Sequence, residues 1–138
     1  MTVINMQTIR YINLLDKEAN VKTTKCFVFN DTIFFAVPGA QVSRAIGPDA
    51  NNIRKIQDKL GKRVKIIREA SRMEDTGRFL QDVVSPIRFK SVEVNGKGIV
   101  VTAGNYQNKA SLIGRNKRRL EELQKIGKDI FGMEIKVI

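Results

Sequence analysis

The sequence predicts an α+β fold built from two similar halves, and three observations lead to this prediction. Apolar residues recur at spacings of three and four in some stretches, as in helices, and at a spacing of two in others, as in strands. A glycine turn followed by an amphipathic stretch occurs twice, at Gly47 and at Gly114, 67 positions apart. The final strands of the two halves match at an offset of 71, so the second long helix carries about one extra turn at 3.6 residues per turn.

The first half is predicted to have the order helix, strand, strand, helix, glycine turn, helix, strand. Met6, Ile9, Ile12 and Leu15 are spaced by three with polar residues between them, which indicates an amphipathic helix. Asp49 is expected to cap the helix that follows the turn. The predicted elements are a helix at 4–18, strands at 21–29 and 33–37, a short helix at 41–46, a helix ending near Leu60-Gly61 and a strand at 62–68.

The second half repeats this order. The predicted elements are a helix at 71–84, strands at 87–94 and 99–101 around an Asn95-Gly96 turn, a short helix at 106–113, a long helix from about 116 to 130 and a strand at 134–138. Two domains, 1–70 and 71–138, follow from the repeat. Since a core of this size is marginal alone, we expect the halves to pack against each other.

Charge points to a polyanionic partner. Lysine and arginine number 25 against 14 acidic residues, which gives a net charge of +11. The excess is shared, with 12 against 6 in residues 1–70 and 13 against 8 in residues 71–138. Nucleic acid explains this better than the alternative, a generic solubilising surface. One cysteine excludes an internal disulfide, and no apolar run is long enough to span a membrane, so we expect a cytoplasmic protein.

The residue types argue against enzymatic function. Histidine and tryptophan are absent, and the carboxylates are scattered through basic surroundings. We therefore predict no catalytic residue, no metal site and no cofactor. Cys26 lies in an apolar strand and is expected to be a core thiol. Tyr11 and Tyr106 can stack on bases, but partial burial against a helix or strand is the stronger expectation.

The two glycine turns are the candidate binding site. Glycine lets another backbone approach closely, and the helix that follows offers N–H groups and a positive dipole end to a phosphate. The alternative is an ordinary connection between two helices. Apolar residues flanking the turns can form the floor of a groove under unstacked bases: Val42, Ile46, Ile53, Leu112, Ile113 and Leu120. Four cations crowd the start of the second long helix, against its dipole: Arg115, Lys117, Arg118 and Arg119.

At this point the chain resembles the type II K-homology (KH) domain, an RNA-binding module with the motif I-G-x-x-G-x-x-[IL]. Residues 46–53 and 113–120 match this motif. The resemblance implies two tandem type II KH domains, each with helices on one face of a three-stranded sheet, and single-stranded RNA as the partner. It also implies the RNA-binding residues Ile46, Gly47, Pro48, Asp49, Ala50, Asn51, Asn52, Arg54, Lys55, Ile113, Gly114, Arg115, Asn116, Lys117, Arg118 and Arg119.

The pair of domains resembles the archaeal-type NusA family of transcription termination/antitermination factors, and the likeness spans nearly the whole chain. It implies a monomer acting in termination or elongation; a ribosome-assembly or ribosome-associated KH protein is the alternative. Bacterial relatives also carry a polymerase-binding domain and an OB-like domain, neither of which is present in this sequence, so RNA polymerase is expected as a partner only through the family.

Both loops depart from the family motif at their fourth position. The motif has glycine there, whereas this chain has Ala50 in the first loop and Lys117 in the second. In the first loop, Pro48 removes an N–H group and Asp49 places a negative charge where a phosphate would lie. We therefore expect the first loop to bind RNA weakly. In the second loop, positive side chains replace backbone contacts with charge.

Overall fold

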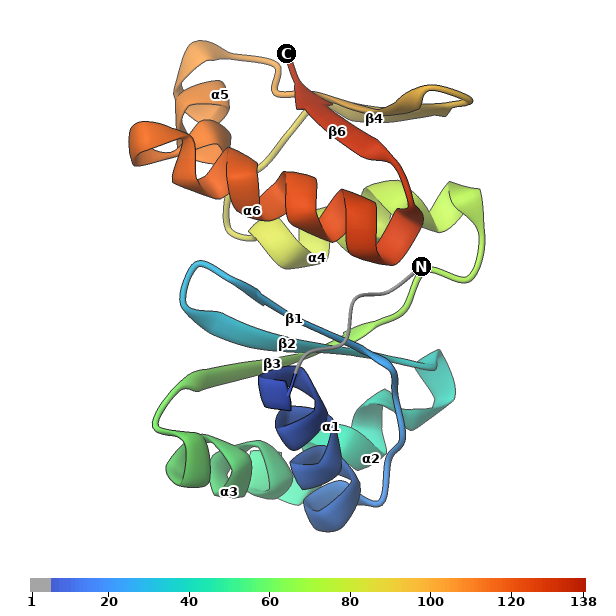
Figure 1. Ribbon diagram of the computed structural model, residues 1–138, viewed down its shortest axis with the longest axis vertical. Helices are drawn as coiled ribbons and strands as arrows, with labels where there is room; N and C mark the ends of the chain where they lie inside the picture. The colour runs from blue at the N-terminus through green and yellow to red at the C-terminus, as the bar shows by residue number, and fades with distance from the viewer. Residues whose placement is uncertain (1–5) are drawn as a thin grey trace. The chain divides into compact units, whose positions relative to one another are not determined.

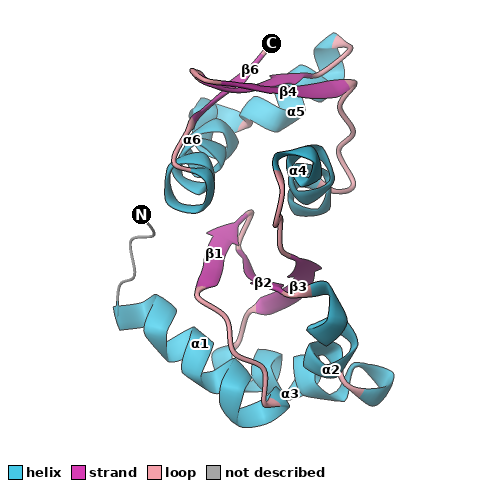
Figure 2. Cartoon of the chain, turned by 90° about the vertical axis from the view of Figure 1, so that its right-hand side faces the viewer, coloured by secondary structure: helices cyan, strands magenta, loops and turns pink. Residues whose placement is uncertain are grey.

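A computed structural model describes residues 6–138 as two compact units, one ending at Glu69 and the other beginning at Ala70 (Figure 1). Each unit has a three-stranded sheet with its helices on one face (Figure 2). This arrangement confirms the predicted α+β fold class and is consistent with tandem KH-like domains. The domain ranges 1–70 and 71–138, and the packing of the two halves against each other, stay predictions.

The first unit follows the predicted order of elements. Its elements are α1 (Met6–Ala19), β1 (Lys25–Phe29), β2 (Thr32–Val37), α2 (Val42–Ile46), α3 (Asn51–Leu60) and β3 (Arg63–Arg68). The predicted first helix starts at residue 4, and residues 4 and 5 lie outside the described residues. The strand predicted to start at residue 21 begins at Lys25, because Val21 leaves the sheet and joins the core, where it is fully buried.

The first sheet has the order β1-β2-β3, in which β1 pairs antiparallel with β2 and β2 pairs parallel with β3. Alternate residues of β2, Ile33 and Phe35, face the helices and pair in register with Val64 and Ile66 of β3. They pack with Leu15 and Ile56 from the helices in one apolar core. The helices on either side of the first glycine turn, α2 and α3, pack into this core through Ala45 and Ile56.

The second unit repeats this order. Its elements are α4 (Thr76–Val84), β4 (Ser91–Asn95), β5 (Gly98–Thr102), α5 (Tyr106–Ile113), α6 (Arg118–Ile126) and β6 (Glu134–Val137). The sheet order is β4-β5-β6, again antiparallel and then parallel. Ile99 pairs with Ile135 in the core, and Phe79 meets Phe131 edge to face at 5.4 Å between ring centroids. The repeat in the sequence is thus a repeat of topology.

Two predicted helices of the second unit differ in detail. α4 starts at Thr76 rather than residue 71, because the Asp75 carboxylate accepts N–H groups of Ser71 and Arg72 and holds a separate turn before it. Where α3 has 10 residues, α6 has 9 and continues into a five-residue π-helical turn, Gly127–Phe131. Four extra residues exceed one 3.6-residue turn, and the wider π turn takes up the difference.

Candidate nucleic-acid interface

The two glycine turns follow the same backbone path. Gly47 has φ 79° and ψ 167°, and Gly114 has φ 75° and ψ 172°. Two residues on, Asp49 and Asn116 have φ values of 53° and 55°. The fourth residues of the loops, Ala50 and Lys117, are left-handed as well, with φ values of 59° and 60°. The sequence repeat therefore extends to the conformation of each loop residue.

Both turns require glycine for steric as well as conformational reasons. A Cβ atom on Gly47 would lie 2.9 Å from Cγ of Asn52, and one on Gly114 would lie 2.6 Å from Cγ of Arg119. The loop in each unit folds back onto the first turn of the following helix, so that no side chain fits between them. The glycine of the motif is thus a structural requirement of this loop.

Asn52 and Arg119 occupy equivalent positions, and each lies against the glycine of its loop. The side-chain Nδ2 of Asn52 donates a hydrogen bond of 2.9 Å to the carbonyl oxygen of Arg44, which ties α3 to the end of α2. The guanidinium of Arg119 forms an ion pair of 2.8 Å with Glu122, one turn along α6. The family motif predicts that both residues bind RNA. Their observed partners lie within the chain: Asn52 links the two helices that flank its loop, and Arg119 pairs along its own helix.

The left-handed fourth position explains why the family motif has glycine there. L-residues adopt this conformation at a cost that glycine does not have, and two such residues in succession are uncommon. Of the seven non-glycine residues with positive φ among the described residues, four lie in these two loops. Ala50 and Lys117 therefore keep the path of the loop and store strain in it, rather than altering its shape.

The predicted role of Asp49 as a helix cap is wrong. The N-cap of α3 is Ala50, and no side chain caps this end of the helix. A capping side chain needs an extended backbone at the cap residue to reach the next N–H groups, and Asp49 instead sits in the left-handed region. The carboxylate of Asp49 is exposed at the loop tip, where it opposes the approach of an anion.

The two loops differ in the charge of their side chains. Arg115, Lys117 and Arg118 are exposed around the second loop, and within the described residues no carboxylate forms a salt bridge with them. Residues 94–120 contain six cations and no acid, whereas the corresponding residues 27–53 contain one arginine and two aspartates. The first loop region is therefore slightly acidic and the second is strongly basic, although their backbones match.

The remaining candidate residues lie at the same ends of the helices. Asn51, Arg54 and Lys55 are exposed on the first turn or so of α3. The predicted groove residues are partly buried, except for one: Leu112 is 1% exposed, because it points into the core, and it cannot contact a base. In each unit the structure thus brings together a glycine loop, the start of a long helix and partly exposed apolar side chains.

The two tyrosines differ from each other. Tyr11 is buried in α1, more fully than the expected partial burial, and its hydroxyl accepts a hydrogen bond of 2.7 Å from Gln7. The expected partial burial of Tyr106 is wrong, because its side chain is 85% exposed. Tyr106 is the first residue of α5, where the polar Asn105 precedes it and no element covers it. Sequence reasoning missed this because the residue type favours burial of a tyrosine, whereas Tyr106 stands at the exposed first position of α5.

The described residues give little support to a reactive cysteine or a metal site. Cys26 is buried as predicted, and burial raises the pKa of its thiol to about 12, so the thiol stays protonated near neutral pH. Residues 6–138 bring no group of three or more histidine, cysteine or carboxylate side chains together as metal ligands. None of the helices in this range has the length and apolar character that a membrane span needs.

Three curated archaeal proteins, each named "Probable transcription termination protein NusA", are similar to the chain. The protein of Methanocaldococcus jannaschii is 28% identical over 89% of this chain and 67% of its own length. That of Halococcus morrhuae is 23% identical over 91% and 90%, and that of Methanococcus vannielii is 24% identical over 98% and 79%. No family model matches the chain.

A solved structure shares the fold. The crystal structure of APE1850 superposes with a TM-score of 0.69 at 21% identity, and the match covers 98% of this chain and all of the other. The order of the helices and strands in both units is therefore that of a known protein structure.

Proposed function

We propose that this chain, an archaeal-type NusA-like protein, binds single-stranded RNA in transcription termination or antitermination, with the second glycine loop as its main phosphate contact. The observation that carries the proposal is the repeated left-handed loop, whose second copy is surrounded by exposed cations. The relatives are named as transcription termination proteins, which supports the process. The sixteen residues of the family motif and its helix start are proposed as the RNA-binding surface.

The second loop has the chemistry that a phosphate requires. Arg115 follows Gly114 directly and offers an N–H group where the first loop has proline. Lys117 and Arg118 stand at the start of α6, where the helix dipole disfavours positive charge. Each such cation costs roughly 0.3–1 kcal/mol when well aligned, less when exposed and screened by salt. A bound phosphate reverses this cost, because it supplies the negative charge that both the dipole and the side chains attract.

The first loop has the same shape without this chemistry. Pro48 has no N–H group, and Asp49 repels a phosphate at the loop tip. The positive side chains of this half near the loop lie on the two flanking helices, Arg44 on α2 and Arg54 and Lys55 further along α3. We propose that this half contributes a secondary contact, and that the two halves together recognise unpaired RNA rather than a duplex, because splayed bases fit between a loop and a partly apolar helix end.

The wider proposals follow the family. We propose that the protein is not an enzyme, acts as a monomer in the cytoplasm and works in association with RNA polymerase and the nascent transcript. Association with ribosomal subunits in place of transcripts would favour the ribosome-associated alternative.

The proposal is tested by titrating fluorescent single-stranded RNA and duplex DNA of equal length at several salt concentrations. Single-stranded RNA is expected to bind more tightly at each salt concentration. If about three phosphates are neutralised, log affinity should fall against log salt with a slope near −2. Equal or tighter binding of the duplex DNA would contradict the proposal.

A further inference from the structure

We infer that Tyr106 stacks on a base of the same RNA strand whose phosphate contacts the second glycine loop. The inference rests on the proposed function and adds a residue to it that lies outside the loop motif. Among the described residues, Tyr106 is the one aromatic side chain that is exposed; the seven phenylalanines and Tyr11 are buried or partly buried. Because the ring is 85% exposed, it contributes little buried apolar area to the core of the protein.

The backbone holds Tyr106 in a fixed position. Asn105 caps α5 with an extended backbone, and its side chain accepts the N–H of Asn108 at 2.8 Å. Lys109 donates its N–H to the carbonyl of Asn105, which closes the first turn. Tyr106 therefore starts from an ordered helix end. A tyrosine on such a support loses little conformational entropy when a ligand contacts it, because only two side-chain torsions remain to be fixed.

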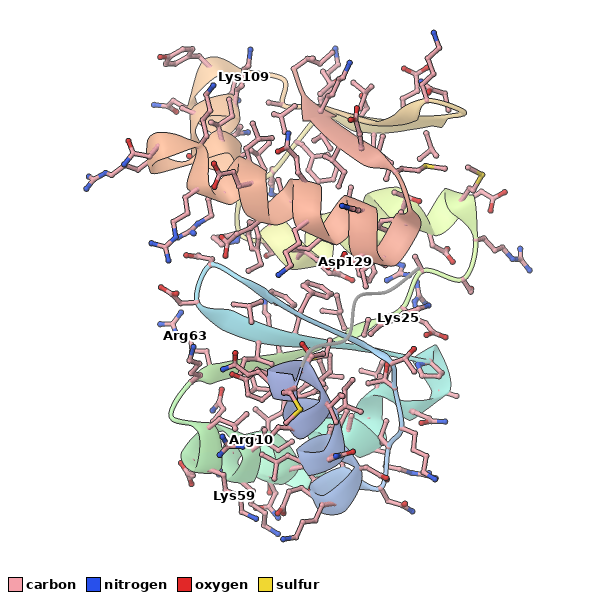
Figure 3. The ribbon with its side chains drawn as sticks, in the orientation of Figure 1. Arg10, Lys25, Lys59, Arg63, Lys109 and Asp129 are labelled. Carbon is pink, nitrogen blue, oxygen red and sulfur yellow. The ribbon has the colours of Figure 1, made fainter. Side chains whose placement is uncertain are left out.

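The charges around the ring suit a nucleic acid. Lys109 lies one turn along α5 from Tyr106 and is labelled in Figure 3. Lys90 packs against Gly104, two residues before Tyr106, where a Cβ atom added to the glycine would lie 3.1 Å from Cβ of Lys90. No acidic residue occurs between residues 94 and 120. An exposed ring among cations is the pattern by which proteins bind single strands, with stacking on bases and ionic contacts to phosphates.

Tyr106 and the second glycine loop lie at the two ends of α5, and the geometry of this helix sets the distance between them. Tyr106, Ala110 and Ile113 recur at i, i+4 and i+7, so they share one face of α5, and this face points away from the buried Leu112. Eight residues separate Tyr106 from Gly114, about 12 Å along the axis. The ring and the loop therefore lie close enough for neighbouring nucleotides of one strand to contact both. Ala110, exposed between them, leaves room for the strand to lie close to the helix.

The first half has no counterpart. The position 67 residues before Tyr106 is Gly39, in a short 3₁₀ turn before α2. The extension of the binding surface beyond the loop therefore belongs to the second half alone.

The test compares Tyr106→Ala, Tyr106→Phe and a control, Met73→Ala, which removes another exposed apolar side chain of the same half. Titration with a single-stranded RNA at several salt concentrations should show about a tenfold loss for Tyr106→Ala. Tyr106→Phe and Met73→Ala should keep the wild-type affinity. The salt slope should not change in any of them, because stacking releases no counterions.

A second readout reports on the ring directly. The chain has two tyrosines and no tryptophan, so Tyr11→Phe leaves Tyr106 as its one tyrosine fluorophore, and RNA should quench its emission. Wild-type affinity in Tyr106→Ala, or unquenched emission at saturating RNA, would overturn the inference while leaving the proposed function intact. Failure of the wild-type protein to bind RNA would overturn the proposed function and the inference together.

Discussion

The two halves carry the same loop on the same scaffold, but with different charges. The φ values of Gly47, Asp49 and Ala50 agree within a few degrees with those of Gly114, Asn116 and Lys117. Within residues 27–53 the net charge is slightly negative, and within residues 94–120 it is strongly positive. The comparison teaches that two loops with the same backbone conformation need not bind the same ligand. Glycine and packing determine the backbone conformation of each loop, whereas the charged side chains determine what the loop can bind.

The strictest test of the shared backbone conformation is to replace the first glycine of each loop. Gly47→Ala and Gly114→Ala should each destabilise the protein by roughly 1–3 kcal/mol, because a Cβ atom both strains the left-handed backbone and overlaps the next helix. Denaturant unfolding measures the effect. Gly61→Ala is the control, since it has positive φ but open space around it, and it should cost less. Destabilisation by only one of the two substitutions would contradict the equivalence of the two loops.

Reversing the charge of the second loop should give the largest decrease in RNA binding. Arg115→Asp combined with Lys117→Asp should weaken binding at least about tenfold and flatten the salt slope, by about 0.7 for each phosphate that the variant no longer neutralises. Folding should survive, because acidic residues are favourable at a helix start. The matched control is Lys22→Asp with Lys62→Asp, which changes net charge equally at two exposed positions outside helices and strands. An unchanged affinity and slope in the loop variant would exclude this loop as the RNA site.

The converse change in the first loop should give a smaller effect. Asp49→Lys with Ala50→Lys copies the charge of the second loop onto the first, and RNA binding should tighten about threefold. This increase stays below the decrease expected for the second loop because Pro48 still lacks an N–H group. Fluorescence titration at fixed salt measures it. An increase as large as that decrease would mean that charge alone, and not the N–H group as well, separates the two loops.

Sequence reasoning locates the repeat, the order of elements and both loops, because apolar spacing and glycine report on burial and turns. It fails where a residue adopts a conformation that its type disfavours. Asp49 resembles a helix cap in the sequence, yet the loop holds it in the left-handed region. Residues 127–131 match a regular helix, yet they form a π turn because the four-residue insertion does not fit a whole α-helical turn. The exposure of Tyr106 escapes prediction, since exposure at a helix start leaves no periodic signal.

The most direct test of the asymmetry is one NMR titration that observes both loops in the same sample. The amide signals of Gly47, Asp49 and Ala50, and of residues 114–117, are followed while single-stranded RNA is added. The account predicts large shifts at Gly114, Arg115, Asn116 and Lys117, and small ones at Gly47, Asp49 and Ala50. Shifts in the first loop that equal or exceed those in the second would contradict it.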